Sequence, residues 1–352
     1  MSISRKMKSE IKAFLLSAIY HKRSPYIEAE AEFGISRQTI RTYLIELEND
    51  GFIIAGKQKT NKQYALKDLK NVHFSYQNLN ALSEDAIYKN AILPLLSEQT
   101  DLVKQKILYI FSEMVNNAIE HSGGNRLDIS YFEDYFCINI FIADDGVGIF
   151  NKIIKDHCLA NAGEVVFELK KGKLTSSPHR HSGEGIFFSS KASDLFIIYS
   201  GSEKAILSET SGAIEEYPLI DSVVQGSVIY FAIKKNTTVP IKEIFDKFTD
   251  EESYDFSKTE IIIRLAQEYE DVLMARSQAR RILRRIEDFQ EVVLDFKDVK
   301  MIGQGFADEV FRIFRREYPE IKVDCINQNA DVLFMIERAK RAAKKESEAN
   351  QK

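Results

Sequence analysis

Two short segments in the middle of the chain constrain its fold more than any other feature: FSEMVNNAIEHS at residues 111–122 and IADDGVGIF at residues 142–150. Apolar residues before and within the first segment recur at three- and four-residue spacing, which predicts a helix with one apolar side. They are Ile107, Leu108, Phe111, Met114, Val115 and Ala118. The second segment ends an apolar run, 136–142, that predicts a buried strand running into Asp144 and Asp145. Two carboxylates at the end of a strand need partners.

The predicted helix has a second, polar side on which Glu113, Asn117 and His121 are spaced four residues apart. A carboxylate and a carboxamide placed in this way can converge on one ligand, because the amide oxygen suits Mg²⁺ and the carboxylate suits proton abstraction from water. After the strand, Gly146 and Gly148 allow the backbone to bend close to a ligand. Each motif alone is also typical of a solvated helix face or a plain turn. Their order, with a strand between them, favours a nucleotide site.

At these residues the chain resembles the GHKL, or Bergerat-fold, superfamily of ATP-binding proteins, which includes gyrase, heat-shock chaperones, histidine kinases and mismatch-repair proteins. Glu113-x-x-x-Asn117 resembles its N-box, in which the glutamate is the general base and the asparagine holds Mg²⁺. Asp144-x-Gly146-x-Gly148 resembles the G1 box, whose aspartate reads the exocyclic amino group of adenine. The resemblance therefore implies ATP and Mg²⁺ as cofactors, Glu113 as the catalytic base, Asn117 as the Mg²⁺ ligand and Asp144 as the adenine ligand.

A third glycine motif, HSGEGIF at 181–187, is similar to the G2 box of the same superfamily, in which a glycine pair opens a helix. Gly183 and Gly185 would there present backbone amides to phosphate. The usual glycine-leucine pattern is replaced by isoleucine and phenylalanine at 186–188, so the identity of the phosphate contacts stays open. In this superfamily the interval 149–182 is the ATP lid, where a lysine would offset phosphate charge. The alternative is a mobile surface loop.

Other nucleotide and metal sites have no support in the sequence. The P-loop pattern G-x-x-x-x-G-K-[ST] does not occur. His179 and His181 lack matching cysteines or carboxylates at ligand spacing, a pattern more typical of solvent-facing histidines. We therefore expect no metal other than Mg²⁺.

The composition is that of a globular protein with two or three domains: 352 residues, of which 44% are hydrophobic. The longest apolar runs are strand-length, short of the roughly 20 residues that a bilayer crossing requires. The amino terminus, MSISRKMKSE, lacks the apolar core of a signal peptide. These features favour a cytoplasmic protein without a membrane segment. Cys137, Cys158 and Cys325 are scattered and odd in number, which favours reduced thiols over a disulfide framework.

The first seventy residues differ from the rest of the chain in charge. They contain 13 Lys and Arg against 8 Asp and Glu, a balance of +5, whereas the whole chain carries −5 and the remainder therefore −10. Apolar spacing predicts helices around 11–19 and 27–33, and a third helix that is capped by Ser36 and stopped by Gly51. Residues 52–66 are typical of two strands around a lysine-rich turn. A basic module on an acidic body is typical of a tethered DNA reader.

The segment EAEFGISRQTIRTYLIELENDGFI resembles the winged helix-turn-helix repressors of bacteria, with the third helix as recognition helix. The resemblance places the first turns of that helix against base edges and the wing against phosphates. The base-reading candidates are Arg37, Gln38, Thr39, Arg41 and Thr42, and the phosphate contacts are Lys57, Lys59 and Lys62. A winged helix also supports protein contact or dimerisation, and this alternative stays open.

The last third of the chain predicts alternating strands and helices, with strands at 261–265, 292–296 and 321–326 and helices at 275–289, 304–317 and from about 329. VVLDFKDVKMIGQGFADEVFRIF resembles STAS-like domains, in particular a branch without established activity that is found fused behind GHKL modules. In phosphorylatable STAS proteins, the loop before this helix carries a serine that a GHKL kinase modifies. Here the loop is IGQGF at 302–306, without a hydroxyl, so phosphorylation there is not expected. Ser277 is more typical of a helix-terminal serine.

We therefore predict a multidomain α/β protein. Its parts are a winged helix-turn-helix DNA-binding domain at 1–70, a GHKL α/β sandwich with helices on a mixed sheet at 71–235, a connector with a short helix at 236–258, a STAS-like α/β domain at 259–345 and a disordered tail at 346–352. The leading function is an ATP-binding, DNA-binding transcriptional regulator switched by Mg-ATP. One alternative is a serine/threonine protein kinase of the anti-sigma type that acts on a STAS-type partner, and another is a nucleotide-dependent interaction scaffold. Whether ATP is hydrolysed, transferred or only sensed stays open, as does a homodimer.

Overall fold

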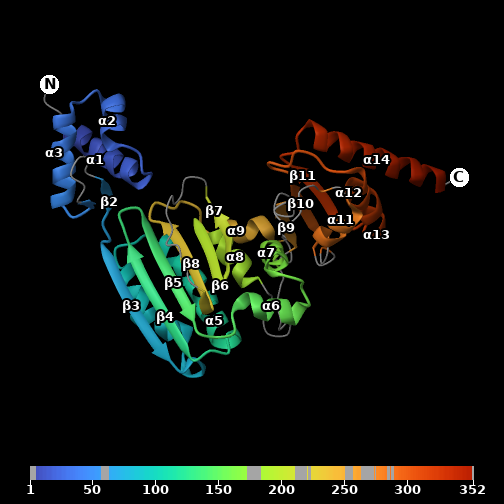
Figure 1. The fold of residues 1–352 in the computed structure, drawn as a ribbon, viewed down its shortest axis with the longest axis horizontal. Coiled ribbons are helices and arrows are strands. Elements are labelled where there is room, and N and C mark those ends of the chain that lie inside the picture. Colours follow the sequence, from blue (N-terminus) through green and yellow to red (C-terminus); the bar gives the residue numbers. More distant parts are fainter. Residues whose placement is uncertain are drawn as a thin grey trace. The chain divides into compact units, whose positions relative to one another are not determined.

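The computed structural model describes residues 5–56, 63–172, 184–210, 220, 223–249, 257–262, 273, 275–283, 286 and 289–350. The protein is mixed α/β, as predicted, and its elements are drawn in Figure 1. Contacts divide it into two compact units, each made of two stretches of chain: Met1–Lys152 with Ser189–Val239, and Ile153–Phe188 with Pro240–Lys352. Within the described ranges, no helix has the length and apolar character needed to cross a membrane.

The amino-terminal module of the first unit, residues 5–69, begins with three helices: α1 (Arg5–Tyr20), α2 (Pro25–Phe33) and α3 (Arg37–Asn49). The Ser36 side chain accepts a hydrogen bond from the Thr39 amide and caps α3 as predicted. Gly34 ends α2 in the left-handed conformation, with φ of 62°, and Gly51 follows α3 with φ of 81°. Capping and glycine signals in the sequence therefore locate these helices correctly.

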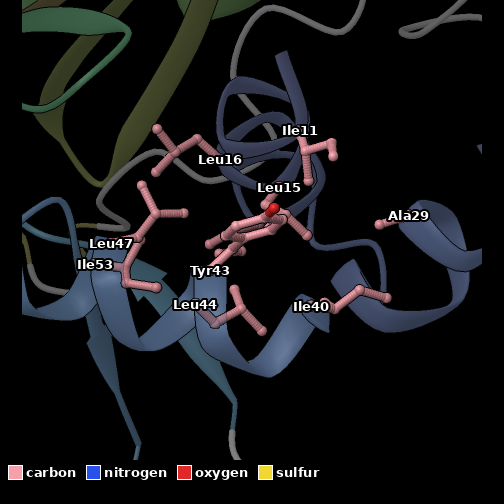
Figure 2. Packing of buried hydrophobic residues seen from close by; sticks show 10 residues of the cluster. Ile11, Leu15, Leu16, Ala29, Ile40, Tyr43, Leu44, Leu47 and Ile53 are labelled. Carbon is pink, nitrogen blue, oxygen red and sulfur yellow. The ribbon is translucent and has the colours of Figure 1, made fainter. Parts of the chain in front are cut away.

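The core of this module is formed where α1 meets α3. Figure 2 shows Ile11 and Leu15 of α1 and Leu44 of α3 among the side chains of this apolar cluster, and all three are fully buried. Ile53 joins them from β1 (Ile53–Ala55), which pairs with β2 (Tyr64–Leu66) in an antiparallel ribbon. The ribbon is the two-stranded element predicted from residues 52–66. Its turn, with Lys57, Lys59 and Lys62, lies outside the described residues.

The rest of the first unit is built on a six-stranded sheet. Its strands are β3 (Lys70–Gln77), β4 (Arg126–Glu133), β5 (Cys137–Asp144), β6 (Leu195–Gly201), β7 (Glu203–Glu209) and β8 (Val224–Lys234), in the order β3-β4-β5-β8-β6-β7. Every neighbouring pair is antiparallel, so the prediction of a mixed sheet was wrong. The reason is β8, which lies between β5 and β6 and runs opposite to both of these otherwise parallel strands.

One face of this sheet is covered by α5 (Asp101–His121), the predicted helix (Figure 1). Four short helical segments precede it, η1 (Leu79–Ala81), α4 (Glu84–Ile87), η2 (Tyr88–Ile92) and η3 (Leu93–Leu96). Ile107, Phe111 and Val115 of α5 are fully buried, as the apolar spacing predicts. Leu108, which we placed on the same stripe, is 42% exposed, and Ile110 is buried instead. The apolar side of α5 is therefore rotated slightly from the predicted one.

The interval that follows β5 contains two helices rather than a continuous loop. They are α6 (Ile149–His157) and α7 (Ala162–Lys171). The Asn161 side chain caps α7 by accepting a hydrogen bond from the Glu164 amide at 3.1 Å. Val165 and Leu169, one helical turn apart, are buried, which explains why this segment folds. Residues 173–183, including His179 and His181, lie outside the described ranges.

The carboxyl-terminal part of the second unit contains a three-stranded parallel sheet in the order β11-β10-β9. Its elements are α9 (Ile241–Phe248), β9 (Lys258–Ile262), α11 (Arg276–Leu283), β10 (Glu291–Asp295), α12 (Gln304–Asp308), η5 (Glu309–Phe314), α13 (Arg315–Glu317), β11 (Lys322–Ile326) and α14 (Ala330–Asn350). The segments from 304 to 317 match the predicted helix, with a π-helical stretch inside it. Helix α14 reaches Asn350, so most of the tail predicted as disordered is helical.

Two groups of contacts connect the 153–188 stretch of this unit to the 240–352 stretch. The Phe188 ring stacks on Phe245 of α9 at 4.2 Å, and Phe187 meets Phe248 edge-on at 5.0 Å. The Thr259 hydroxyl of β9 donates to the Lys171 carbonyl at 2.7 Å. Segments far apart in sequence therefore share one apolar core.

Candidate functional site

The polar side of α5 lies at the border between core and solvent. Glu113 and Asn117 are both half-buried, while Met114 and Ala118, their neighbours along the chain, are buried against the sheet. This position follows from the amphipathic spacing of the helix, because a residue beside the apolar stripe is only partly covered. Both residues are therefore partly accessible to solvent, on a helix whose apolar side is fixed in the core.

Asp144 ends strand β5 on the same face of the sheet as the buried Ile142 and Ile140. One of its carboxylate oxygens accepts a hydrogen bond from the Gly146 amide at 2.9 Å. Burial raises the pKa of Asp144 above its ordinary value, although hydrogen bonds from Gly146 and Ser227 oppose this effect. A carboxyl group in this setting gains from one further donor, which is what a ligand amino group would supply.

Asp145, the next residue, has a different role. Its Oδ1 atom accepts hydrogen bonds from the backbone amides of Asn125 at 2.7 Å and Arg126 at 2.8 Å. These bonds hold the pKa of Asp145 below its ordinary value. The two adjacent carboxylates therefore have different partners: Asp145 bonds to the start of β4, whereas Asp144 bonds to the turn that follows its own strand and to Ser227.

The Asp144 turn, residues 144–148, is packed so closely that its glycines have no room for a side chain. A Cβ atom at Gly146 would collide with the carbonyl group of Ser122, and one at Gly148 would lie 2.7 Å from the Ser200 hydroxyl. Gly148 also has a φ of 83°, which favours glycine. The Val147 amide donates to the Ser122 carbonyl at 2.9 Å, and Ser122 caps α5. The turn is therefore tied to the end of the helix that carries Glu113 and Asn117.

Two serines that the sequence analysis missed lie in the same row of the sheet as Asp144. The strand register pairs Asp144 with Ser227 of β8, and Ser227 with Ser200 of β6, so the three residues form one row across three strands. The Ser227 hydroxyl accepts the Ile149 amide at 2.9 Å. Ser200 is 3% exposed, and within the described part of the chain its hydroxyl has no hydrogen-bond partner. Only the pairing of distant segments reveals this row, which no local motif marks.

The glycine motif at 181–187 is only partly described. Gly185 is the first residue of α8 (Gly185–Ala192), which agrees with a glycine opening a helix. Residues 173–183, which include Lys173, His179, His181 and Gly183, lie outside the described ranges. The phosphate-binding role of Gly183 and Gly185 therefore stays a prediction.

The residues around the Asp144 turn do not form a metal site by themselves in the described part of the chain. Among the described residues, no group of three or more His, Cys, Asp or Glu side chains could hold a metal. A single amide such as that of Asn117 is enough where phosphate oxygens and water supply the other ligands of Mg²⁺. The glycine turn packs closely against Ser122 and Ser200, and the Ser200 hydroxyl is buried, without a hydrogen-bond partner among the described residues.

The second candidate surface is α3 of the amino-terminal module. Arg37, Gln38, Arg41 and Thr42 are exposed, whereas Tyr43 and Leu44 face the core. The Thr39 hydroxyl lies 3.0 Å from the Ser36 hydroxyl, so Thr39 contributes to the helix cap. Four of the five predicted base-reading residues therefore share one accessible face, with two arginines among them.

In the carboxyl-terminal α/β region, residues 304–306 of the predicted loop belong to α12, and only residues 302 and 303 precede this helix. The Gly303 amide donates to the Leu273 carbonyl at 2.8 Å, and Ile302 is fully buried. Arg280 of α11 pairs with the buried Glu309 at 2.6 Å, which fastens α11 to the helix that follows the loop. No curated protein matches the chain. Residues 278–333 match the family model of a STAS-like domain of unknown function (DUF4325), so the chain carries a STAS-like domain in its carboxyl-terminal part.

Proposed function

We propose that this protein is an ATP-responsive, DNA-binding transcriptional regulator. The observation that carries the proposal is the Asp144 turn, which is hydrogen-bonded to the residue that caps α5, the helix of Glu113 and Asn117. A ligand-facing carboxyl group, a close-packed glycine turn, a carboxamide and a second carboxylate belong to one unit of structure. This combination, in the order that resembles the GHKL superfamily, favours adenine nucleotide over other ligands.

The residues of the site would divide the work as follows. Asp144 accepts the exocyclic amino group of adenine, and the turn at Gly146 and Gly148 lets the base approach the backbone. Asn117 provides an oxygen to Mg²⁺. Glu113 orients and deprotonates a water molecule if hydrolysis takes place. Bound Mg²⁺ neutralises phosphate charge, and everything else that the site does comes from these side chains.

DNA recognition is assigned to the exposed face of α3. Arginine side chains there match the acceptor atoms of guanine in the major groove, and each good bidentate contact contributes about 1–3 kcal/mol of discrimination. The surplus of positive charge in the first seventy residues supports the same assignment. The STAS-like domain supplies a surface for a protein partner, since such domains commonly mediate protein interactions.

Regulation requires ATP to prefer one state of the protein. A ligand that inverts a population from 1:99 to 99:1 must bind the favoured state about 5.5 kcal/mol more tightly. The nucleotide therefore acts as a switch only if DNA affinity differs between the ATP-bound and ATP-free forms.

The nucleotide half of the proposal is tested with Asn117→Ala and Glu113→Ala. Calorimetry with Mg-ATP should show binding by the wild type, an affinity loss of about 100-fold for Asn117→Ala because a metal ligand is removed, and near-normal binding for Glu113→Ala. Any release of labelled phosphate from γ-labelled ATP should fall by about 10²–10⁴ in Glu113→Ala. Asn116→Ala, on the neighbouring half-buried asparagine, is the matched control. Absence of ATP binding by the wild type would contradict the proposal, and label on a protein side chain would favour the kinase.

The DNA half is tested with Arg41→Ala. A duplex selected by the wild-type protein from a random-sequence library serves as probe, and gel-shift titration measures its affinity. We expect a loss of about 1–3 kcal/mol, because one base-edge contact is removed. Arg23→Ala, which removes an exposed arginine from the loop between α1 and α2, is the control. It should leave the affinities for DNA and for ATP unchanged. Equal shifts for wild type and Arg41→Ala, with ATP binding intact in both, would favour a protein-contact role for this module.

A further inference from the structure

The amino-terminal module and the sheet meet at the turn between β4 and β5, which we call the hairpin turn (residues 134–136). The Tyr20 hydroxyl, at the end of α1, lies 3.3 Å from the Cys137 sulfur at the start of β5. The Tyr20 and Phe136 rings are 4.9 Å apart. On the other side, Phe52 meets Tyr135 edge-on at 5.4 Å. The hairpin turn thus contacts both α1 and the segment that leads into β1.

These contacts are continuous with the core of the amino-terminal module. Tyr135 and Phe136 are half-buried and pack against the cluster formed by α1, α3 and β1. Their own rings are 4.9 Å apart at nearly right angles, so they form one aromatic unit. The module therefore rests on the hairpin turn with its core, and is not connected to the sheet by a linker alone.

The hairpin turn is itself rigidly held. Asp134 accepts hydrogen bonds from the amides of Phe136 at 2.7 Å and Cys137 at 2.8 Å. The Lys235 amide, just after β8, donates to the Phe136 carbonyl at 2.8 Å. Its ammonium group donates to the Asp134 carbonyl at 3.0 Å. A turn with this many internal bonds moves as one body with the strands beneath it.

Glu133, at the base of the turn, reinforces this arrangement. Its side chain is buried and accepts hydrogen bonds from Gln99 at 2.9 Å, Tyr131 at 2.8 Å and Lys235 at 2.8 Å, with Lys70 at 3.2 Å as a second cation. Burial opposes the charge, yet these partners hold the pKa of Glu133 below its ordinary value. Because Lys70 begins β3, the same carboxylate also fixes the point where the chain leaves the amino-terminal module.

Strand β5 connects this junction directly to the candidate nucleotide site. It begins at Cys137, against Tyr20, and ends at Asp144, so its ends are roughly 24 Å apart. We propose that the hairpin turn, through Tyr135 and Phe136, is the surface by which nucleotide at the Asp144 turn changes the DNA affinity of the amino-terminal module. The inference rests on the proposed function and names the route of its regulation.

The physical basis is differential contact. Nucleotide bound to the carboxylate of Asp144 would shift the β4–β5 hairpin as a whole. The hairpin turn, which moves with these two strands, would carry that shift to α1. Linkage requires the effect to be reciprocal: the factor by which ATP changes DNA affinity equals the factor by which DNA changes ATP affinity. In coupled sites of this kind, binding of one ligand changes the affinity for the other by about 5- to 150-fold.

The test measures this factor in both directions, with the selected duplex and Mg-ATP, for wild type, Phe136→Ala and Phe132→Ala. Phe136→Ala removes the ring that contacts Tyr20, and we expect each ligand alone to bind within about threefold of wild type while the factor falls below about twofold. Phe132→Ala removes a ring of the same hairpin that instead meets Phe141 at 5.9 Å, and it should keep the wild-type factor. A factor unchanged in Phe136→Ala would overturn the inference, as would an equal loss in Phe132→Ala.

A second measurement does not depend on DNA or on a truncated side chain. The chain contains no tryptophan, so Tyr135→Trp creates a single fluorescent reporter at the junction. Titration with Mg-ATP should change its emission. Over the concentrations that saturate this protein, the same titration in a Tyr135→Trp, Asn117→Ala background should give almost no change. Binding of ATP without any change in emission overturns the inference and leaves the proposed function standing. Failure of the wild type to bind ATP in calorimetry overturns both.

Discussion

Asp144 and Asp145 are adjacent in sequence, but the protein shifts the pKa values of their carboxyl groups in opposite directions. Burial raises the pKa of Asp144, whereas backbone amides lower that of Asp145. A motif such as Asp-Asp-Gly cannot say which carboxylate is used by the fold, because the answer depends on where β4 begins. The structure resolves this ambiguity by pairing Asp145 with the amides of Asn125 and Arg126.

The raised pKa of Asp144 predicts an acid-sensitive nucleotide site. In the proposed site, the anionic form would accept a hydrogen bond from the amino group of adenine, so ATP affinity should reach its full value above the raised pKa. It should fall by about tenfold for each pH unit below that value. The measurement is calorimetric ATP affinity against pH for wild type and Asp144→Asn, whose ratio cancels the ionisation of the phosphates. The variant should bind weakly at every pH, so the ratio should shrink towards acid. A constant ratio would show that Asp144 does not carry this dependence.

Among the elements, the Asp144 turn depends most on the packing around it. Gly148 combines a positive φ with a contact to Ser200, whereas Gly201 has a φ of 62° and open space around it. A side chain at Gly201 would therefore meet only backbone strain, whereas a side chain at Gly148 would meet backbone strain and a steric clash.

We expect Gly201→Ala to lower the free energy of unfolding by about 1–2 kcal/mol through its backbone conformation alone. Gly148→Ala carries the same strain and also displaces the Ser200 hydroxyl, so it should cost more and should reduce ATP affinity at least tenfold. Urea denaturation and calorimetry measure the two effects. Equal losses of stability with unchanged ATP affinity in both variants would place the nucleotide elsewhere.

Elements with strong local signals could be predicted from the sequence, and those that depend on distant partners could not. Apolar spacing with caps and glycines located α3, α5 and β5. Helix α7 was not predicted because its lysine-rich end resembles a loop. The burial of Val165 and Leu169 explains why this segment is helical. For the site, local motifs identified Glu113, Asn117 and Asp144 as candidates. The row formed with Ser227 and Ser200 required the strand register, which no short motif contains.

At the scale of the whole molecule, charge and connectivity divide differently. The basic balance belongs to the first seventy residues, while the remaining chain carries the acidic excess. If the protein binds DNA as proposed, this acidic excess should disfavour contact with the duplex outside the amino-terminal module. The STAS-like domain is the part whose family is recognised, yet its compact unit also includes residues 153–188.

That discontinuity has a consequence for the order in which the protein is made. Ribosomal synthesis releases residues 153–188 well before Phe245, Phe248 and Thr259, their partners, exist. Residues 189–239, which complete the sheet, emerge in between. The nascent chain can therefore fold its first unit before the carboxyl-terminal third is synthesised. Until then, Phe187 and Phe188 lack their aromatic partners in α9. In a protein truncated at residue 240, the stretch 153–188 would have no partner. Such a protein should depend on chaperones and aggregate, and should not simply lose one domain.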